Sequence, residues 1–308
     1  MKEKARTVVV DDAGGGEPPM LEEPLVVSAP LARRVAPDLC RKDPASGEDC
    51  AWYHGSWQYF RALDLVTAPS DHADFLLDAL GSLARADGSR RILVSGAADY
   101  SMPAHVLWAY AKESAVADVT VVDICETPLF LTKWYAETRS ARLQTKACDI
   151  LDYETERPFD VLCTHSFLGN FAADQRRDVI AKWRDLLRPG GKVITVNRVR
   201  PANAPEKVRF TREQAAEFRE AVLREARVRR DILGVDPEEL ASCAQTYAES
   251  KRTHPIRSRE EIIELFEGGG FAIERFELGG VPGKFGKRPS GPTAPGDAEY
   301  ARIVASRL

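Results

Sequence analysis

Residues Ile92–Ile124 read ILVSGAADYSMPAHVLWAYAKESAVADVTVVDI, and this segment sets the architecture that we expect for the whole chain. It begins with a short apolar run, passes through a turn at Gly96 and ends in a second apolar run, Val119–Ile124. Between the two runs, Pro103–Ser114 has the pattern of a helix. Two continuous apolar strands joined by a helix are typical of a parallel sheet that is covered on both faces.

The same alternation continues along the chain. Strands and helices follow one another as far as Asn197, and two further strands close the chain after a run of helices. This order predicts an α/β fold with a doubly wound, seven-stranded and mostly parallel sheet. The predicted strands are 91–95, 119–124, 143–150, 159–166, 191–197, 271–278 and 300–306, and the predicted helices include 103–114, 129–139, 174–187 and 211–233.

Composition divides the chain into three regions. Residues 1–30 contain the run DDAGGGEPP, which cannot bury apolar surface, so we expect a disordered tail there. Residues 31–88 are largely helical and are expected to form an N-terminal helical lid. Residues 89–308 are expected to form the main domain, with a helical insertion at about 201–256 after the fifth strand.

The overall composition excludes several classes of protein. Of the 308 residues, 44% are hydrophobic, which is enough for a sizeable core and rules out wholesale disorder. The 43 Lys and Arg residues are balanced by 47 Asp and Glu residues, so the chain lacks the basic footprint of a nucleic-acid-binding protein. No stretch approaches the roughly 20 apolar residues that cross a bilayer. We therefore expect a cytoplasmic protein with neither a nucleic-acid nor a membrane partner.

The cysteines give no sign of a metal site in the sequence. The six are spread along the chain without a C-x2-C pair, and no histidine stands close enough to suggest a zinc knuckle. Three of them lie in apolar, strand-like runs, where a small buried thiol is the expected role. The sequence thus predicts that no metal is bound.

The turn after the first strand indicates which ligand the sheet can bind. Ligands of doubly wound sheets lie beyond the carboxyl ends of the strands, and a dinucleotide site there requires G-x-G-x-x-G. Here Ala98 and Ser101 stand at the later glycine positions, which disfavours a dinucleotide but not a nucleoside without phosphates. Asp123 ends the second strand, where a carboxylate can accept hydrogen bonds from ribose hydroxyls, and Asp149 adds a second carboxylate on the same rim.

With these features the chain resembles the class I S-adenosylmethionine-dependent methyltransferases. The resemblance covers roughly residues 90–308 and rests on the segments ILVSGAADY, VTVVDIC, ACDIL, FDVLCTHSFLGNF and LLRPGGKVITVN. It implies a Rossmann-like methyltransferase fold with an antiparallel seventh strand, and S-adenosyl-L-methionine as the cofactor. It also implies that Gly96 lies under the methionine part, Asp123 binds the ribose and Asp149 holds the adenine edge. The residues expected to contact the cofactor are Arg61, Gly96, Ala97, Ala98, Tyr100, Asp123, Ile124, Asp149, Ile150, His165 and Ser166.

The departures from that family pattern concern the methionine part of the cofactor. Val94 stands where the family often has an acidic residue. Ala98 and Tyr100 stand where the family has further glycines. We therefore expect the ammonium group of the methionine part to be held differently than usual.

Methyl transfer leaves few marks in a sequence, because in-line displacement needs alignment and desolvation more than strong acid–base groups. In the N-terminal segment, helical spacing places Tyr53, Trp57 and Phe60 in one aromatic stripe, with Arg61 on a neighbouring face, where it could pair with a carboxylate. The stripe either docks this helix on the sheet domain or covers the active site, where aromatic faces stabilise a cation. The residues expected to act in the reaction are Tyr53, His54, Trp57, His165 and Asn170.

Three functions stay open at this point. The first is methyl transfer to a small-molecule acceptor. The second follows from the similarity of SGAADYSM and D-x-C-x-T-P-L (Asp123–Leu129) to a bacterial subgroup that includes azetidine-2-carboxylate synthases. In those enzymes the amine of S-adenosylmethionine closes a ring and methylthioadenosine leaves. The third is a degenerate, non-catalytic fold that serves as a partner protein, which the missing glycines favour. The sequence determines neither the acceptor nor the oligomeric state.

Overall fold

The computed structural model describes residues 21–42, 47–86, 89–281, 289–296 and 298–308. Residues 1–20 of the predicted tail lie outside this part of the chain. The rest of that prediction is wrong, because helix α1 (Leu25–Leu39) includes residues 25–30. Ser28 and Ala29 are fully buried, and Ala29 shares a hydrophobic core with residues of the next helix, α2 (Ala51–Ala62), against which α1 packs.

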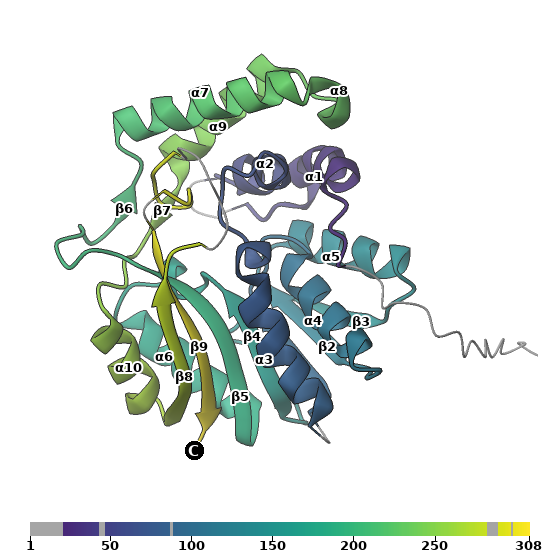
Figure 1. Cartoon of the computed structure of the whole chain (residues 1–308), viewed down its shortest axis with the longest axis vertical. Helices are drawn as coiled ribbons and strands as arrows, with labels where there is room; N and C mark the ends of the chain where they lie inside the picture. The colour runs from purple at the N-terminus through teal and green to yellow at the C-terminus, as the bar shows by residue number, and fades with distance from the viewer. Residues whose placement is uncertain (1–20, 43–46, 87–88, 282–288, 297) are drawn as a thin grey trace, which may run out of the picture.

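A seven-stranded sheet forms the centre of the molecule, in the order β3-β2-β1-β4-β5-β9-β8 (Figure 1). Strands β1 to β5 are parallel, and β9 runs antiparallel between β5 and β8. This arrangement confirms the predicted α/β fold with its antiparallel strand. The strand order reverses between β1 and β4, where doubly wound sheets open a crevice for ligands. The strands are β1 (Arg91–Ser95), β2 (Asp118–Asp123), β3 (Leu143–Ala147), β4 (Phe159–His165), β5 (Leu187–Val199), β8 (Phe271–Gly279) and β9 (Glu299–Arg307).

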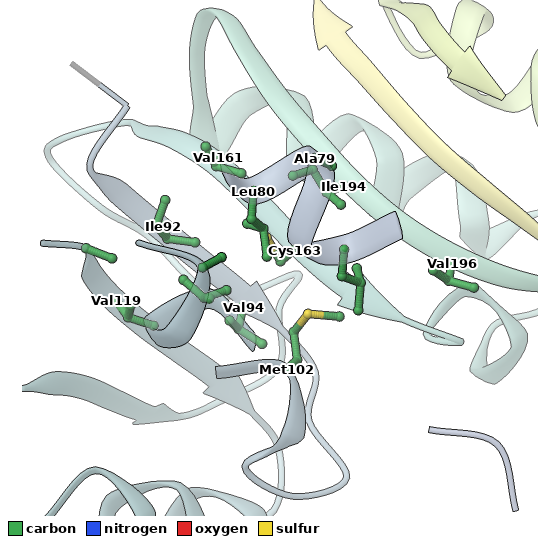
Figure 2. Close-up of a cluster of buried hydrophobic side chains, with 14 of the residues drawn as sticks. Ala79, Leu80, Ile92, Val94, Met102, Val119, Val161, Cys163, Ile194 and Val196 are labelled. Atoms are coloured by element: carbon green, nitrogen blue, oxygen red, sulfur yellow. The ribbon is translucent and has the colours of Figure 1, made fainter. Parts of the chain in front are cut away.

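Helices cover both faces of the sheet, because successive residues of a strand point to opposite sides. In β1, Ile92 and Val94 belong to a core that includes helices α3 and α4, whereas Leu93 belongs to a second core that includes α6 and α10. Figure 2 shows the first core, in which Leu80 of α3 lies among side chains of β1 and β4. These helices and their neighbour α5 are α3 (Ala73–Arg85), α4 (Ser101–Lys112), α5 (Glu126–Thr138), α6 (Gln175–Leu186) and α10 (Arg259–Gly268).

The predicted lid extends to residue 88 and so includes helix α3, but the structure places this helix elsewhere. Phe75, Leu76 and Leu80 of this helix are buried in the same core as β1. The helix therefore belongs to the sheet domain rather than to a lid. An amphipathic helix shows the same sequence pattern whichever surface it packs on, so the pattern alone could not place it.

The remaining helices form a layer over the carboxyl ends of the strands (Figure 1). Helices α1 and α2 of the N-terminal segment lie there beside three helices of the insertion. Phe60 of α2 packs against Phe218 and Tyr247 of the insertion, with ring centroids 5.2 Å away in both cases. The N-terminal segment and the insertion thus share one hydrophobic core. The insertion helices are α7 (Arg212–Val228), α8 (Arg230–Leu233) and α9 (Pro237–Ser250).

The insertion differs from its prediction in one detail. The expected single helix 211–233 is interrupted at Arg229, so that α7 and α8 are separate. Two short strands, β6 (Val208–Arg209) and β7 (Arg252–Thr253), pair with each other at the base of the insertion. Among the residues that the structure describes, no helix combines the length and apolar character needed to span a bilayer.

Candidate functional site

A cavity of about 480 Å³ lies between the carboxyl edge of the sheet and helix α2. Small-molecule sites typically have volumes of about 300–1,000 Å³. The wall is built from the ends of β1 to β5, from α2 and from the insertion. The predicted site residues in this wall are Tyr53, His54, Trp57, Gly96, Ala97, Ala98, Asp123, Ile124, Asp149, Ile150, His165, Ser166 and Asn170.

Gly96 begins the turn after β1 with a φ of +75°, a conformation that favours glycine. The ring of Phe167 lies against it, so a β-carbon at Gly96 would come within 2.3 Å of two ring carbons. Phe167 follows Ser166, whose φ of +53° turns the chain at the end of β4. The ring of Phe167 stacks on that of Trp183, with centroids 6.2 Å apart. The glycine expected under the cofactor therefore also makes room for an aromatic ring in the cavity wall.

Asp123 and Asp149 bring two carboxylates to the same cavity wall. Asp123 accepts hydrogen bonds from the backbone N–H groups of Ala97 and Cys125, both at 2.8 Å. Burial raises the pKa of Asp123 to about 6, although these hydrogen bonds act to lower it. Asp149 accepts a hydrogen bond from the backbone N–H of Leu151 at 2.9 Å. Both carboxyl groups are thus held in place by the turns that follow their strands.

Helix α2 supplies an aromatic part of the wall. The rings of Tyr53 and Trp57 lie side by side, with centroids 5.2 Å apart, and both residues line the cavity. Phe60, the third member of the predicted stripe, is fully buried against the insertion and does not line the cavity. One helix therefore docks on the insertion through Phe60 and faces the cavity through the other two rings.

Three cationic side chains in the wall were not predicted from the sequence. Arg198 and Arg200 lie at the end of β5, and Lys251 directly follows α9. The ammonium group of Lys251 lies 4.7 Å from the centroid of the Tyr53 ring, and burial lowers its pKa to about 8. Burial and the nearby Arg198 lower the pKa of Arg200 to about 9. The arginines could have been found as residues at a strand end, whereas no sequence pattern brings Lys251 here.

His165 and Asn170 both line the cavity; His165 is the last residue of the central strand β4, and Asn170 lies in the turn that follows it. Burial, together with Arg61 and His105, lowers the pKa of His165 to about 3, so its imidazole is neutral at physiological pH. Its Nε2 is buried without a hydrogen-bond partner among the described residues. A neutral imidazole of such low basicity is suited to a hydrogen bond with a ligand rather than to general-base catalysis.

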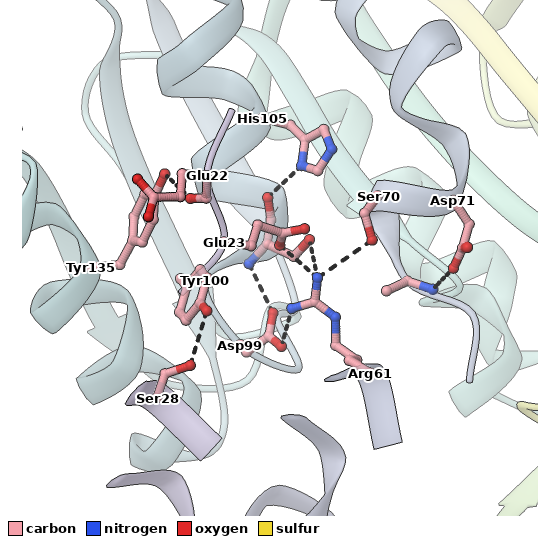
Figure 3. Close-up of polar contacts among 12 residues, drawn as sticks. Glu22, Glu23, Ser28, Arg61, Ser70, Asp71, Asp99, Tyr100, His105 and Tyr135 are labelled. Atoms are coloured by element: carbon pink, nitrogen blue, oxygen red, sulfur yellow. Dashed lines mark hydrogen bonds and ion pairs between the residues drawn. The ribbon is translucent and has the colours of Figure 1, made fainter. Parts of the chain in front are cut away.

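Arg61 and Tyr100 do not line the cavity, which corrects their assignment to the cofactor. Arg61 donates hydrogen bonds to Asp99 at 2.7 Å and to Glu23 at 2.6 Å, so its guanidinium group is paired with carboxylates of the protein (Figure 3). Tyr100 is fully buried, and its hydroxyl lies 2.9 Å from the hydroxyl of Ser28. Glu23 and Ser28 belong to the segment expected to be a disordered tail, so these partners could not be anticipated.

His54 lies in a cluster with three cysteines beside the cavity. Its Nδ1 is 3.4 Å from Sγ of Cys125 and 3.5 Å from Sγ of Cys40. Burial lowers the pKa of His54, but hydrogen bonds to Cys125 and Cys50 and the negative charge of their thiolate forms raise it more, to about 9. The ligand atoms of these four residues lie within 4.8 Å of one another, an arrangement that the spacing of the cysteines in the sequence did not indicate.

Residues 103–191 match a family model described as a methyltransferase domain. This match covers less than one third of the chain. No curated protein matches the sequence.

Several solved structures are similar to most of the chain at low sequence identity. The chain is similar to the pyocyanin biosynthetic protein PhzM, with 18% identity and a TM-score of 0.42, over 75% of this chain and 54% of that chain. It is also similar to the 1,6-didemethyltoxoflavin-N1-methyltransferase of Burkholderia thailandensis (17%, TM-score 0.47, 79% of this chain and 92% of that chain). A third similar structure is the magnesium protoporphyrin IX methyltransferase of Synechocystis PCC 6803. It has 11% identity and a TM-score of 0.48, over 83% of this chain and 96% of that chain. The chain thus spans about half the length of the first of these proteins.

Proposed function

We propose that this chain is an S-adenosylmethionine-dependent methyltransferase that acts on a small, anionic acceptor. The observation that carries the proposal is the placement of Gly96, Asp123 and Asp149 around one cavity at the carboxyl edge of the sheet. The methyltransferase-domain match of residues 103–191 supports it independently.

The cavity wall suits a nucleoside. Asp123 can accept hydrogen bonds from ribose hydroxyls through the lone pairs that its two backbone donors leave free. The neighbouring side chain of Ile124 is aliphatic yet 51% exposed, and it offers an apolar surface to a purine ring. Asp149 and Ile150 lie in the same wall and are assigned to the adenine edge.

When bound, S-adenosylmethionine supplies an electrophilic methyl group on a positively charged sulfur. The rings of Tyr53 and Trp57 offer π faces to such a cation and keep water away from the reacting groups. Asp99 also lines the cavity, while its carboxylate pairs with Arg61. We assign Asp99 to the ammonium group of the methionine part, in place of the acidic residue that is absent at Val94.

The charges of the wall indicate an anionic acceptor. Asp123 ends β2 and Asp149 follows β3, whereas Arg198 and Arg200 lie at the end of β5, on the other side of β1 and β4. The arginines are therefore suited to a carboxylate or similar group of the acceptor. Lys251 is suited to accept a proton from an O–H or N–H nucleophile, because its pKa of about 8 leaves part of it neutral at physiological pH.

Isothermal titration of S-adenosylmethionine into two variants of strand β2 tests the cofactor site. Asp123→Asn should weaken binding about 10–100-fold, because a charged hydrogen bond contributes about 1.5–3 kcal/mol. Asp118→Asn is the matched control, because Asp118 is the exposed residue at the opposite end of the same strand. Equal affinities of both variants and the wild type would show that the cofactor does not bind at this rim.

Incubation with S-adenosylmethionine alone, followed by mass spectrometry, separates the remaining alternatives. Methyl transfer predicts that the cofactor stays intact until an acceptor is added and then yields S-adenosylhomocysteine. Methylthioadenosine together with a cyclic amino acid would instead establish azetidine-2-carboxylate synthesis. Absence of binding at millimolar cofactor would favour a non-catalytic partner protein. The cationic groups of the wall favour a separate acceptor and hence methyl transfer.

A further inference from the structure

Four potential metal ligands from distant segments meet beside the proposed cofactor cavity. Cys40 follows α1, Cys50 and His54 lie at the start of α2, and Cys125 separates β2 from α5. Three Sγ atoms and one ring nitrogen lie within 4.8 Å of one another. Cys40, His54 and Cys125 are at most 6% exposed, and Cys50 is half-buried.

Four of the six separations between these atoms match the edges of a tetrahedral metal site, and the other two are at most 4.8 Å. With Zn–S bonds of about 2.3 Å and Zn–N bonds of about 2.0–2.1 Å, a tetrahedron has S···S edges of about 3.8 Å and S···N edges of about 3.5 Å. Sγ of Cys125 lies 3.8 Å from that of Cys40 and 3.5 Å from that of Cys50. Nδ1 of His54 lies 3.5 Å from Sγ of Cys40 and 3.4 Å from Sγ of Cys125. A disulfide, by contrast, requires its sulfurs to lie about 2.05 Å apart.

We infer that these four side chains form a structural zinc site. Three thiolates and one imidazole are a Cys3His donor set, whose soft sulfur ligands and tetrahedral arrangement select Zn²⁺. Protein ligands fill all four positions, which distinguishes a structural site from a catalytic one that keeps a position open for water or substrate.

The surroundings favour the thiolate forms that bind zinc. Cys50 and Cys125 are the N-cap residues of α2 and α5, helices of 12 and 13 residues, whose N-termini stabilise negative charge. Oγ1 of Thr127 lies 3.2 Å from Sγ of Cys40, where it can donate a hydrogen bond to the thiolate. Zinc binding transfers the protons of the thiols, and the proton of a charged imidazole, to solvent.

The position of the site indicates its role. It joins the end of α1 and the start of α2 to the turn that follows β2, two residues after Asp123. The metal therefore holds α2, and with it Tyr53 and Trp57, over the cavity. The sheet has its own hydrophobic cores, so removal of zinc should destabilise the N-terminal helices more than the sheet.

The test is the metal content of the full chain. The protein is purified without a metal-binding tag from cells grown in zinc-supplemented medium, and its zinc is measured by inductively coupled plasma mass spectrometry. We expect one zinc per chain in the wild type and in Cys243→Ser, a control at a half-buried cysteine of α9 outside the cluster. Cys50→Ser and Cys125→Ser should lose the metal. A wild type without zinc, or full zinc content in both cluster variants, overturns the inference.

A second measurement uses only the wild type, so it does not depend on whether the variants fold. Protein stripped with a chelator and titrated with Co²⁺ should develop thiolate-to-cobalt charge-transfer bands and the intense d–d bands of a tetrahedral site, saturating at one equivalent. Absence of these bands overturns the inference, as does a Cys50–Cys125 disulfide in anaerobically isolated protein. Neither measurement involves cofactor or acceptor, so the outcome is independent of the proposed methyl transfer.

Discussion

A β-carbon on Gly96 would lie 2.3 Å from the ring of Phe167, so the turn after β1 and the end of β4 can approach each other only because residue 96 is glycine. The φ of +75° at Gly96 adds a second reason for glycine at this position. Phe167 is in turn supported by Trp183 of α6. The proposed cofactor turn is thus coupled to the packing of the sheet's second core.

We expect Gly96→Ala to destabilise the protein and to weaken S-adenosylmethionine binding. The left-handed conformation costs alanine about 1 kcal/mol, and overpacking against Phe167 costs a further ~1–3 kcal/mol. Thermal unfolding measures the first effect and calorimetric titration the second. Gly268→Ala is the control, because Gly268 has open space around it, and its stability should be unchanged within about 0.5 kcal/mol. If Phe167→Ala recovered none of the lost stability in the double variant, the proposed clash would be wrong.

Arg61→Ala should be among the more destabilising substitutions in the N-terminal helices. It would leave Asp99 and Glu23 buried without their shared cation, and breaking such a pair costs about 3–5 kcal/mol. Arg33→Ala removes the more exposed ion pair of Arg33 with Glu239 and should cost at most about 1 kcal/mol. Denaturant unfolding of both variants gives the comparison. Similar losses for the two would contradict a special role for the buried pair.

The pH dependence of the reaction should report on Lys251. Burial disfavours its charged form and lowers its pKa to about 8, so the neutral amine that can accept a proton becomes more abundant as pH rises. We expect kcat/KM to increase up to about pH 8 and to level off above it. The other charged or titratable residues in the same cavity wall are Cys50, Tyr53, His54, Asp99, Asp123, Cys125, Cys148, Asp149, His165, Arg198, Arg200, His254 and Tyr300.

Substitution distinguishes Lys251 from those neighbours. Lys251→Met should abolish the rise in kcat/KM and reduce the rate, because no amine is left to accept the proton. Lys133→Met, at an exposed lysine of α5, should keep the wild-type profile. Retention of the rise in Lys251→Met would assign the titration to a different group.

Arg200→Met should affect the acceptor and spare the cofactor. Arg200 lines the cavity and also donates a hydrogen bond to the carbonyl of Pro292 at 2.6 Å, which orients its guanidinium group. Loss of a charged hydrogen bond to an anionic acceptor should raise its KM about 10–100-fold. The Kd of S-adenosylmethionine should stay within about twofold, and Arg209→Met, at an exposed arginine of β6, should change neither value. An equal rise in the Kd of the cofactor would show that Arg200 serves the cofactor instead.

Most of the fold follows from local sequence. The strands β1, β2, β4 and β5 are apolar runs that alternate between two cores, and the helices between them have clear turns at their ends. The errors concern placement rather than pattern. Helix α3 has an ordinary amphipathic pattern but packs on the sheet, and residues 25–30 belong to α1, where Ala29 is buried in one core with residues of α2.

The residues of the cavity also divide into those that the sequence predicts and those that it does not. Local sequence was sufficient to predict that Gly96, Asp123 and Asp149 line the same cavity, because the carboxyl ends of parallel strands meet at one edge of a sheet. Local sequence could not predict that Lys251 lies in the cavity wall, nor which residues pair with Arg61. These contacts join residues that are far apart in the sequence.

The cysteine–histidine cluster is the clearest case of a site that tertiary packing creates and sequence spacing does not indicate. Cys40 and Cys125 lie 85 positions apart and carry no spacing that marks a metal site. Patterns of apolar residues specify strands and helices because they depend on neighbours a few positions away. The distance between two sulfurs depends instead on how α1 and α2 fold back over the sheet, which only the packing of the whole chain sets.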